Sequence, residues 1–216
     1  MLEVRAQGRP ARGDKEVGRA RLLERARHIM NAKPKVDLQR REIALAAGVT
    51  PALVSYYYPD KWDLVAAAGQ PIIAAYAAEA RAIMSAPGTA QRRLGALTYL
   101  FVEFNFRNSH LLDFFLENSG RMSRRDDMKL VQDVKADLTD FFDGLIRTGV
   151  LRDVGAAFVR SALWGICRHL AQRPDLVGTA DQDAALRRLA ERAYSLFLSG
   201  VAAPALVAEE PMPYED

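Results

Sequence analysis

Cysteine, histidine and long apolar runs are all scarce in this sequence of 216 residues. Cys167 is the only cysteine, so the chain forms neither an intramolecular disulfide nor an all-cysteine metal site. His28, His110 and His169 are scattered, and none joins a Cys, Asp or Glu at a recognised metal-ligand spacing. We therefore predict no metal site and no other cofactor.

Membrane and export signals are also missing. No stretch reaches the roughly 20 apolar residues that a membrane-spanning helix requires, and residues 1–12 carry charges without the apolar core of a signal peptide. Together with the single cysteine, which suits a reducing compartment, these absences predict a cytoplasmic protein with no membrane partner.

Sequence motifs of catalysis are absent as well. The chain has no nucleophile elbow, no phosphate-binding glycine loop and no dinucleotide fingerprint. Glu103, Asp113 and Glu117 flank aromatic residues and suggest paired carboxylates, but polar positions on amphipathic helices explain them more simply. We therefore predict that the protein is not an enzyme.

The residues that are present favour a helical globular protein. Hydrophobic residues make up 50% of the chain and charged residues 26%, as in ordinary folded domains. Alanine, leucine and arginine dominate, whereas consecutive β-branched residues are rare, which favours helices over strands. The predicted fold is all-α with about nine helices, arranged as a small N-terminal head and a larger C-terminal body.

Positive charge is concentrated in the N-terminal third. Residues 1–64 hold 13 Lys and Arg against 8 Asp and Glu, a net charge of +5, whereas residues 65–216 carry a net charge of −2. This asymmetry indicates a polyanionic partner for the head, with a solvated basic face as the alternative. Residues 1–16 are interpreted as a flexible basic arm, which either follows DNA or is an ordinary disordered terminus.

Breaker and capping residues divide the head into short helices. The apolar spacing predicts a first helix over 17–30, and a second over 40–47 with Asp37 as a possible cap and Gly48 as its end. Thr50 followed by Pro51 is a strong start signal for a third helix that runs to about Tyr57. Asp60 then caps a long fourth helix that ends near Ser85.

The body is predicted to contain five further helices. They span about 90–107, 108–118, a segment that follows Ser123 and Asp126 and ends at Gly149, 153–171 and 181–199. The resulting domain division is an arm at 1–16, a helix-turn-helix domain at 17–60, a body at 61–205 and a loose acidic tail at 206–216.

The segment Arg41–Ala68, REIALAAGVTPALVSYYYPDKWDLVAAA, resembles the DNA-binding region of the TetR family of transcriptional regulators. The resemblance depends on an ordered combination of residues and covers 17–68 well, whereas the rest of the chain matches only in length and helical character. The residues that carry it are Ile43, Ala44, Ala47, Gly48, Val49, Thr50, Val54, Tyr57, Tyr58, Lys61 and Leu64.

The resemblance implies that the third helix enters the major groove of DNA. Lys61 falls at the family's near-universal backbone-contacting lysine, and Arg40 at a phosphate-contact position; Arg41 is placed to reach a base edge. Ser55 stands where the family usually has a tyrosine, which puts that phosphate contact in doubt. Tyr58 is expected to be core. The predicted DNA-binding residues are Arg40, Arg41, Thr50, Pro51, Ala52, Leu53, Ser55, Tyr56, Tyr57 and Lys61.

The resemblance also implies a ligand pocket in the body and a homodimer formed through the last two helices. The candidate pocket residues are aromatic or of mixed polarity, although plain core packing is the alternative for each: Tyr76, Phe101, Phe104, Phe115, Trp164 and His169. Cys167 is either a thiol sensor beside Arg168 and His169 or a buried, inert residue.

These expectations describe a repressor that binds a pseudo-palindromic double-stranded DNA operator and is released by an unidentified small-molecule effector. The alternatives are an activator or ligand-independent regulator and, in a different class, an all-helical carrier or enzyme.

Overall fold

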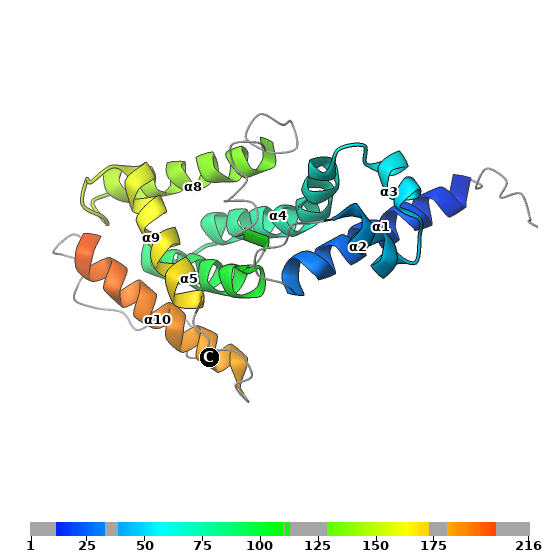
Figure 1. Cartoon of the computed structure of the whole chain (residues 1–216). Coiled ribbons are helices and arrows are strands. Elements are labelled where there is room, and N and C mark those ends of the chain that lie inside the picture. The colour runs from blue at the N-terminus through cyan, green and yellow to red at the C-terminus, as the bar shows by residue number, and fades with distance from the viewer. Residues whose placement is uncertain (1–11, 33–38, 110, 113–128, 173–180, 202–216) are drawn as a thin grey trace, which may run out of the picture.

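The computed structural model of the chain is built from helices, as predicted. Eight helices have defined bounds, and no strand element occurs within the ranges that the structure describes (Figure 1). These ranges are 12–32, 39–109, 111–112, 129–172 and 181–201.

Three helices form the head: α1 (Arg12–Ala32), α2 (Arg40–Ala47) and α3 (Pro51–Tyr57). They pack because each presents apolar residues at helical spacing to one shared core. The fully buried members of that core include Leu22, Ala26, Met30, Ile43, Ala47 and Val54.

The turn between α2 and α3 depends on one glycine and one threonine. Gly48 adopts a left-handed φ of 66°, and the backbone N–H groups of Gly48 and Val49 donate to the carbonyls of Leu45 and Ala44. This arrangement satisfies the last carbonyls of α2 in the manner of a Schellman motif. The Thr50 hydroxyl accepts from the Leu53 N–H at 3.3 Å, which caps α3 as predicted.

Helix α4 (Lys61–Ser85) connects the two parts of the molecule. Its first turns contribute Leu64, Val65 and Ala68 to the head core, whereas Tyr76 and Ala77 belong to the body core. The chain changes direction between the start of α4, beside α3, and the part that runs along the body (Figure 1). The predicted boundary at residue 60 therefore cuts through the head core, because the start of α4 completes that core.

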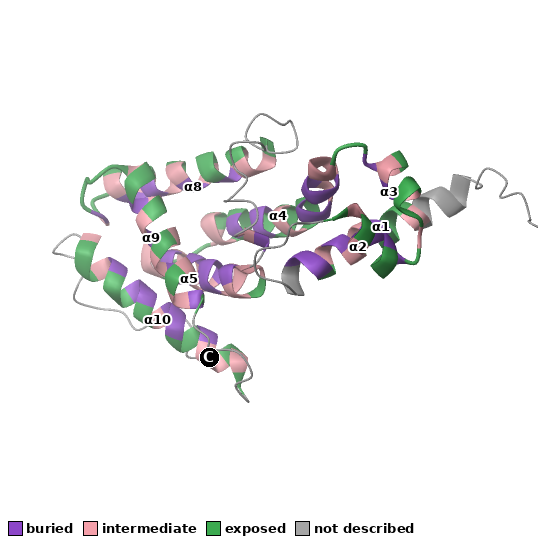
Figure 2. Cartoon of the chain, in the orientation of Figure 1, coloured by how far each residue is buried: buried purple, intermediate pink, exposed green. Residues whose placement is uncertain are grey.

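The body combines the second half of α4 with four more helices: α5 (Ala90–Arg107), α8 (Lys129–Arg147), α9 (Ala156–Ala171) and α10 (Gln182–Val201). Helix α5 packs against α4, α9 and α10, and α8 packs against α4 and α9. Figure 2 shows the buried faces of these helices turned toward one another. Phe101, Phe142, Leu163 and Leu186 are among the fully buried residues of this core.

Several predicted helix ends agree with the structure. Asp60 caps α4 by accepting from the Trp62 N–H at 3.0 Å, and α5 spans the predicted 90–107. Gly149 adopts the expected left-handed conformation, with φ 73°, just after α8. These ends were predictable because each depends on a capping or turn residue adjacent in sequence.

Four predicted boundaries need correction. Helix α1 begins at Arg12, so residues 12–16 are helical and do not belong to a flexible arm. The N-cap of α2 is Gln39, not Asp37. Helix α9 begins at Ala156, because Gly155 takes a φ of 87°, and the Asp153 carboxylate accepts from the Gly155 N–H at 3.2 Å. Asp181 caps α10 from just outside it by accepting from the Ala184 N–H at 3.1 Å.

Other predictions lie outside the described residues. These are the arm over 1–11, the sixth helix beyond residue 112, the pair Ser123 and Asp126, and the acidic tail. Among the described helices, none is both long and apolar enough to cross a membrane.

Candidate nucleic-acid interface and body cavity

Helix α3 presents a mixed surface to solvent. Pro51 and Ala52 are exposed at its N-terminal end, and Leu53 and Ser55 are half-buried. The Tyr56 side chain is 64% exposed, which makes it the largest exposed side chain of the helix. Apolar atoms at the helix start suit thymine methyl groups, while the Tyr56 and Ser55 hydroxyls supply hydrogen-bonding groups.

The three consecutive tyrosines have three different environments. Tyr58 is buried, and its hydroxyl accepts from Arg19 Nε at 3.0 Å. The pKa of Arg19 is raised, chiefly by this hydrogen bond. Tyr57 is half-buried against the head core and makes an edge contact with Tyr56, with ring centroids 5.4 Å apart. Tyr58 is therefore core, as expected, and Tyr56 is the tyrosine whose side chain lies outside the core.

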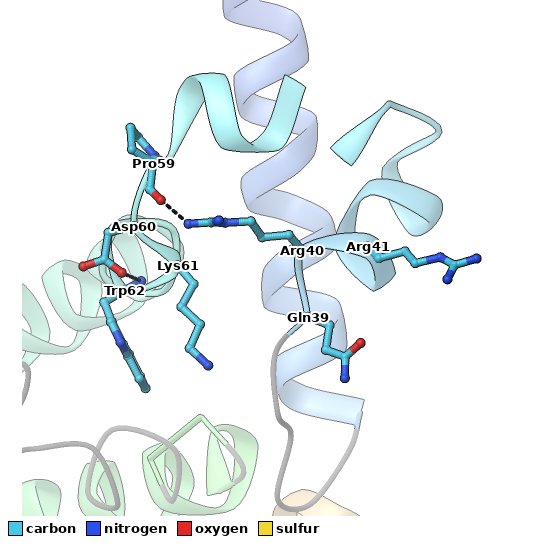
Figure 3. Close-up of a pocket in the computed structure, with 7 residues that line it drawn as sticks. All are labelled: Gln39, Arg40, Arg41, Pro59, Asp60, Lys61 and Trp62. Atoms are coloured by element: carbon cyan, nitrogen blue, oxygen red, sulfur yellow. Dashed lines mark hydrogen bonds between the residues drawn. The ribbon is translucent and has the colours of Figure 1, made fainter. Parts of the chain in front are cut away.

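A cleft of about 630 Å³ lies beside α3, between the start of α2 and the start of α4 (Figure 3). Arg40 reaches across it and donates through its guanidinium to the Pro59 carbonyl. This bond ties α2 to the segment that leads into α4. Lys61 lines the same cleft, and its ammonium lies 5.2 Å from the centroid of the Trp62 ring, close enough for a cation–π contact.

The basic side chains of this region do not converge on one point. Figure 3 shows the Arg41 guanidinium pointing away from Arg40 and Lys61. Such a spread suits an extended anion, because successive phosphates along a DNA strand need separate cations. Thr50, by contrast, uses its hydroxyl to cap α3. Three of the predicted DNA-binding residues, Arg40, Arg41 and Lys61, thus line one cleft, and Arg40 also bonds within the protein to the Pro59 carbonyl.

In the body, four of the predicted pocket residues form one aromatic cluster. The Tyr76 ring centroid lies 4.4 Å from that of Phe104 and 6.0 Å from that of Trp164, and Phe101 and Trp164 are 5.4 Å apart. Burial raises the pKa of Tyr76 well above its ordinary value, so its hydroxyl stays neutral.

Only part of this cluster borders open space. Tyr76 and Phe104 line a cavity of about 440 Å³, whereas Phe101 is fully buried and belongs to the core. The expectation for His169 needs correction, because it is exposed in the last turn of α9 and does not line this cavity. Phe115 lies outside the described residues.

Cys167 lies in the body core. Its side chain is fully buried, its thiol lies 3.8 Å from the Thr98 carbonyl, and burial raises its pKa. Cys167 is therefore the buried, inert residue and not a thiol sensor, since a reactive thiol requires exposure and a lowered pKa. The described residues contain no group of three or more potential metal ligands.

Solved structures of other proteins share this arrangement of helices. A TetR-family transcription regulator from Marinobacter aquaeolei VT8 superposes with a TM-score of 0.66 at 18% identity, covering 89% of this chain and 100% of that one. A TetR/AcrR-family regulator from Thermobifida fusca gives 0.63 at 22% identity, with 84% and 97% covered. The chain has the fold of the TetR-family regulators.

The similarity extends to a protein of unknown function, but it is not found at the level of sequence. A protein of unknown function from Rhodococcus sp. RHA1 is similar to the same extent, with a TM-score of 0.67 at 20% identity over 92% of this chain and all of that one. No protein-family model and no curated protein sequence matches the chain. The fold that the resemblance in 41–68 implied is thus confirmed from the three-dimensional architecture.

Proposed function

We propose that this protein is a homodimeric, sequence-specific DNA-binding transcriptional regulator of the TetR family, a repressor that a small-molecule effector releases from its operator. The observation that carries the proposal is the surface of the head. The exposed face of α3, with Tyr56 in its last turn, lies beside a cleft that Arg40 and Lys61 line, and Gly48 and Thr50 fix the turn before α3.

This surface matches the two requirements of DNA recognition. A short helix that projects from its own core enters the major groove, where side chains on its exposed face contact base edges. Cations on both sides of that helix contact phosphates and fix its register. Arg41 and Lys61, which point in different directions, suit phosphates on either side of the groove (Figure 3).

A dimer is supported by the outer surface of the last two helices. Phe158 on α9 is 64% exposed and Leu196 on α10 is 60% exposed, and the two helices pack against each other. Large apolar side chains on adjacent helices favour pairing with the same helices of a second subunit as a four-helix bundle. Two heads then occupy half-sites one helical turn, or about 34 Å, apart.

Selection from randomised duplex DNA at near-physiological salt tests the proposal, because salt suppresses purely electrostatic binding. We expect an inverted repeat. Phe158→Glu combined with Leu196→Glu is expected to give a folded monomer by sedimentation and to lower operator affinity by at least about tenfold. Failure to recover any consensus from effector-free protein would reject the regulator function and favour a helical carrier or enzyme.

A further inference from the structure

The cavity beside Tyr76 lies at the junction of head and body. Its lining comes from α1, α4 and α5, so a molecule bound there touches both parts of the protein. Its volume of about 440 Å³ falls within the range of roughly 300 to 1,000 Å³ that is typical of small-molecule sites. This cavity, hereafter the junction cleft, differs in position from the interior of the body core.

Part of the lining of the junction cleft is aromatic and apolar. Tyr76 and Phe104 face it from α4 and α5 with their rings 4.4 Å apart and inclined by 34°. Leu100 and Ile72 add further apolar side chains to the lining. The floor therefore suits an aryl or alkyl group, which gains free energy by leaving water.

Charge is distributed unevenly along the junction cleft. Arg27 contributes from α1 of the head, together with Ile72, which packs against the head core. Glu79 lies seven residues beyond Ile72 on α4, or about 10 Å along the helix. Arg27 thus places a positive charge at the end of the cleft near the head, and Glu79 places a negative charge further along α4.

The charged groups also differ in whether they already have partners. Glu103 and Arg107 form an ion pair at 2.9 Å, and Arg107 reaches Asp183 at 3.4 Å. Within the described part of the chain, Arg27 makes no hydrogen bond or ion pair. A half-buried guanidinium at the end of an apolar cleft favours an anionic group, and its two parallel N–H donors match a carboxylate.

Pro71 is the point at which a ligand in the junction cleft can change the bend of α4. It lines the cleft and lies within α4, between Ala68, the last residue of α4 buried in the head core, and Tyr76, the first one buried in the body core. Proline lacks the N–H that would bond to the carbonyl of Ala67, and its ring crowds that carbonyl, so a helix bends most easily there.

We propose that the junction cleft binds a small apolar carboxylate, which pairs with Arg27 and lies on Tyr76 and Phe104, and that the bound molecule sets the angle of α4 at Pro71. The head contacts the ligand through Arg27 and the body through the two rings. The ligand therefore distinguishes between angles of the head, and only a ligand with such a preference shifts the population. The regulatory part of this proposal rests on the proposed DNA-binding function, whereas the part that concerns carboxylate binding does not.

Calorimetry on the free, full-length protein tests the binding part. The probes are 4-phenylbutyrate, its uncharged amide and the corresponding amine, which share one aryl chain. We expect the carboxylate to bind at least about tenfold more tightly than the amide, and the Arg27→Gln variant to lose that preference. Arg92→Gln, which removes an exposed arginine of α5 away from the cleft, is the matched control and should behave as the parent.

Each alternative result contradicts the assignment. Equal affinity for acid and amide, or an unchanged preference in Arg27→Gln, would remove the role of the guanidinium. Tighter binding of the amine would instead identify a cation site at Glu79. No heat of binding from any of the three at millimolar concentration would overturn the site.

Two substitutions on α4 test the location and the coupling. Ala75 lines the junction cleft and Ala74 does not, although both are exposed. Ala75→Trp should fill the cleft, abolish carboxylate binding and change operator affinity in the direction that the ligand does, whereas Ala74→Trp should do neither. Normal carboxylate binding by Ala75→Trp would place the site elsewhere.

Pro71→Ala should still bind the carboxylate, but the ligand's effect on operator affinity should fall by at least about threefold, because the helix no longer bends at a defined point. An undiminished effect would reject the hinge. Failure of the proposed function has a different signature: the parent protein then selects no operator, while the calorimetric preference and its dependence on Arg27 remain measurable.

Discussion

The head and the body place their candidate functional groups differently with respect to their cores. In the head, Tyr56 and Arg41 are exposed and the core lies on the opposite face of α2 and α3. In the body, Tyr76 and Phe104 line a cavity and at the same time pack against the main core. Substitutions can therefore separate recognition from stability in the head, but in the body they change both together.

The largest expected effect concerns the body core and the helix that joins the two parts. Phe142 is fully buried, with its ring against those of Phe141 and Phe197. Phe142→Ala should lower the free energy of unfolding by about 3–5 kcal/mol, as is typical when a large buried ring is removed. Urea denaturation followed by fluorescence measures this loss.

The same experiment tests whether α4 couples head and body. Trp62 reports on the head and Trp164 on the body, and variants that retain only one of them give separate unfolding curves. If α4 makes the two cores cooperative, Phe142→Ala shifts both curves equally. A head curve that stays in place while the body curve moves would show that the two parts unfold independently.

The reactivity of Cys167 measures how often the body core opens to solvent. Burial raises its pKa, so near pH 8 the reactive thiolate is present at a lower fraction than for an ordinary cysteine, and reaction requires opening of the body. We expect a disulfide reagent to modify Cys167 at least about a hundredfold more slowly than an exposed thiol. A Cys167→Ser, Ser85→Cys variant supplies that control at the exposed end of α4. Equal rates would show that the body opens freely.

The head offers the opposite case, in which recognition changes without stability. Tyr56→Ala removes a side chain that is 64% exposed. Loss of a base or phosphate contact costs about 1–3 kcal/mol, so operator affinity should fall by roughly tenfold to a hundredfold. The melting temperature should stay nearly unchanged. Leu45→Ala, which removes an apolar side chain that is 82% exposed on α2, is the matched control, and an equal loss of affinity there would discount a specific role for Tyr56.

The same contrast explains what the sequence predicted and what it did not. Gly48, Thr50 and Asp60 determine helix ends through bonds to residues within five positions, so their signals could be read directly. The junction cleft depends on α1, α4 and α5 meeting in space, and neither Arg27 nor Glu79 carried a local signal for it. Pro71 did carry a local signal, since proline inside a long helical pattern indicates a bend. Its place between the buried α4 residues of the head core and those of the body core could be found only from the structure.

The smallest expected effect is at Tyr58, where stability changes and recognition does not. The buried ring remains in Tyr58→Phe, but the hydroxyl that accepts from Arg19 Nε at 3.0 Å is lost. A hydrogen bond to a charged, solvent-accessible donor of this kind contributes about 1 kcal/mol, because Arg19 can bond to water instead. Urea denaturation should therefore show a small loss, and operator affinity should stay within twofold of the parent. A tenfold loss of affinity would mean that Arg19 and Tyr58 together orient α3, and that even in the head the core and the recognition surface are not separable.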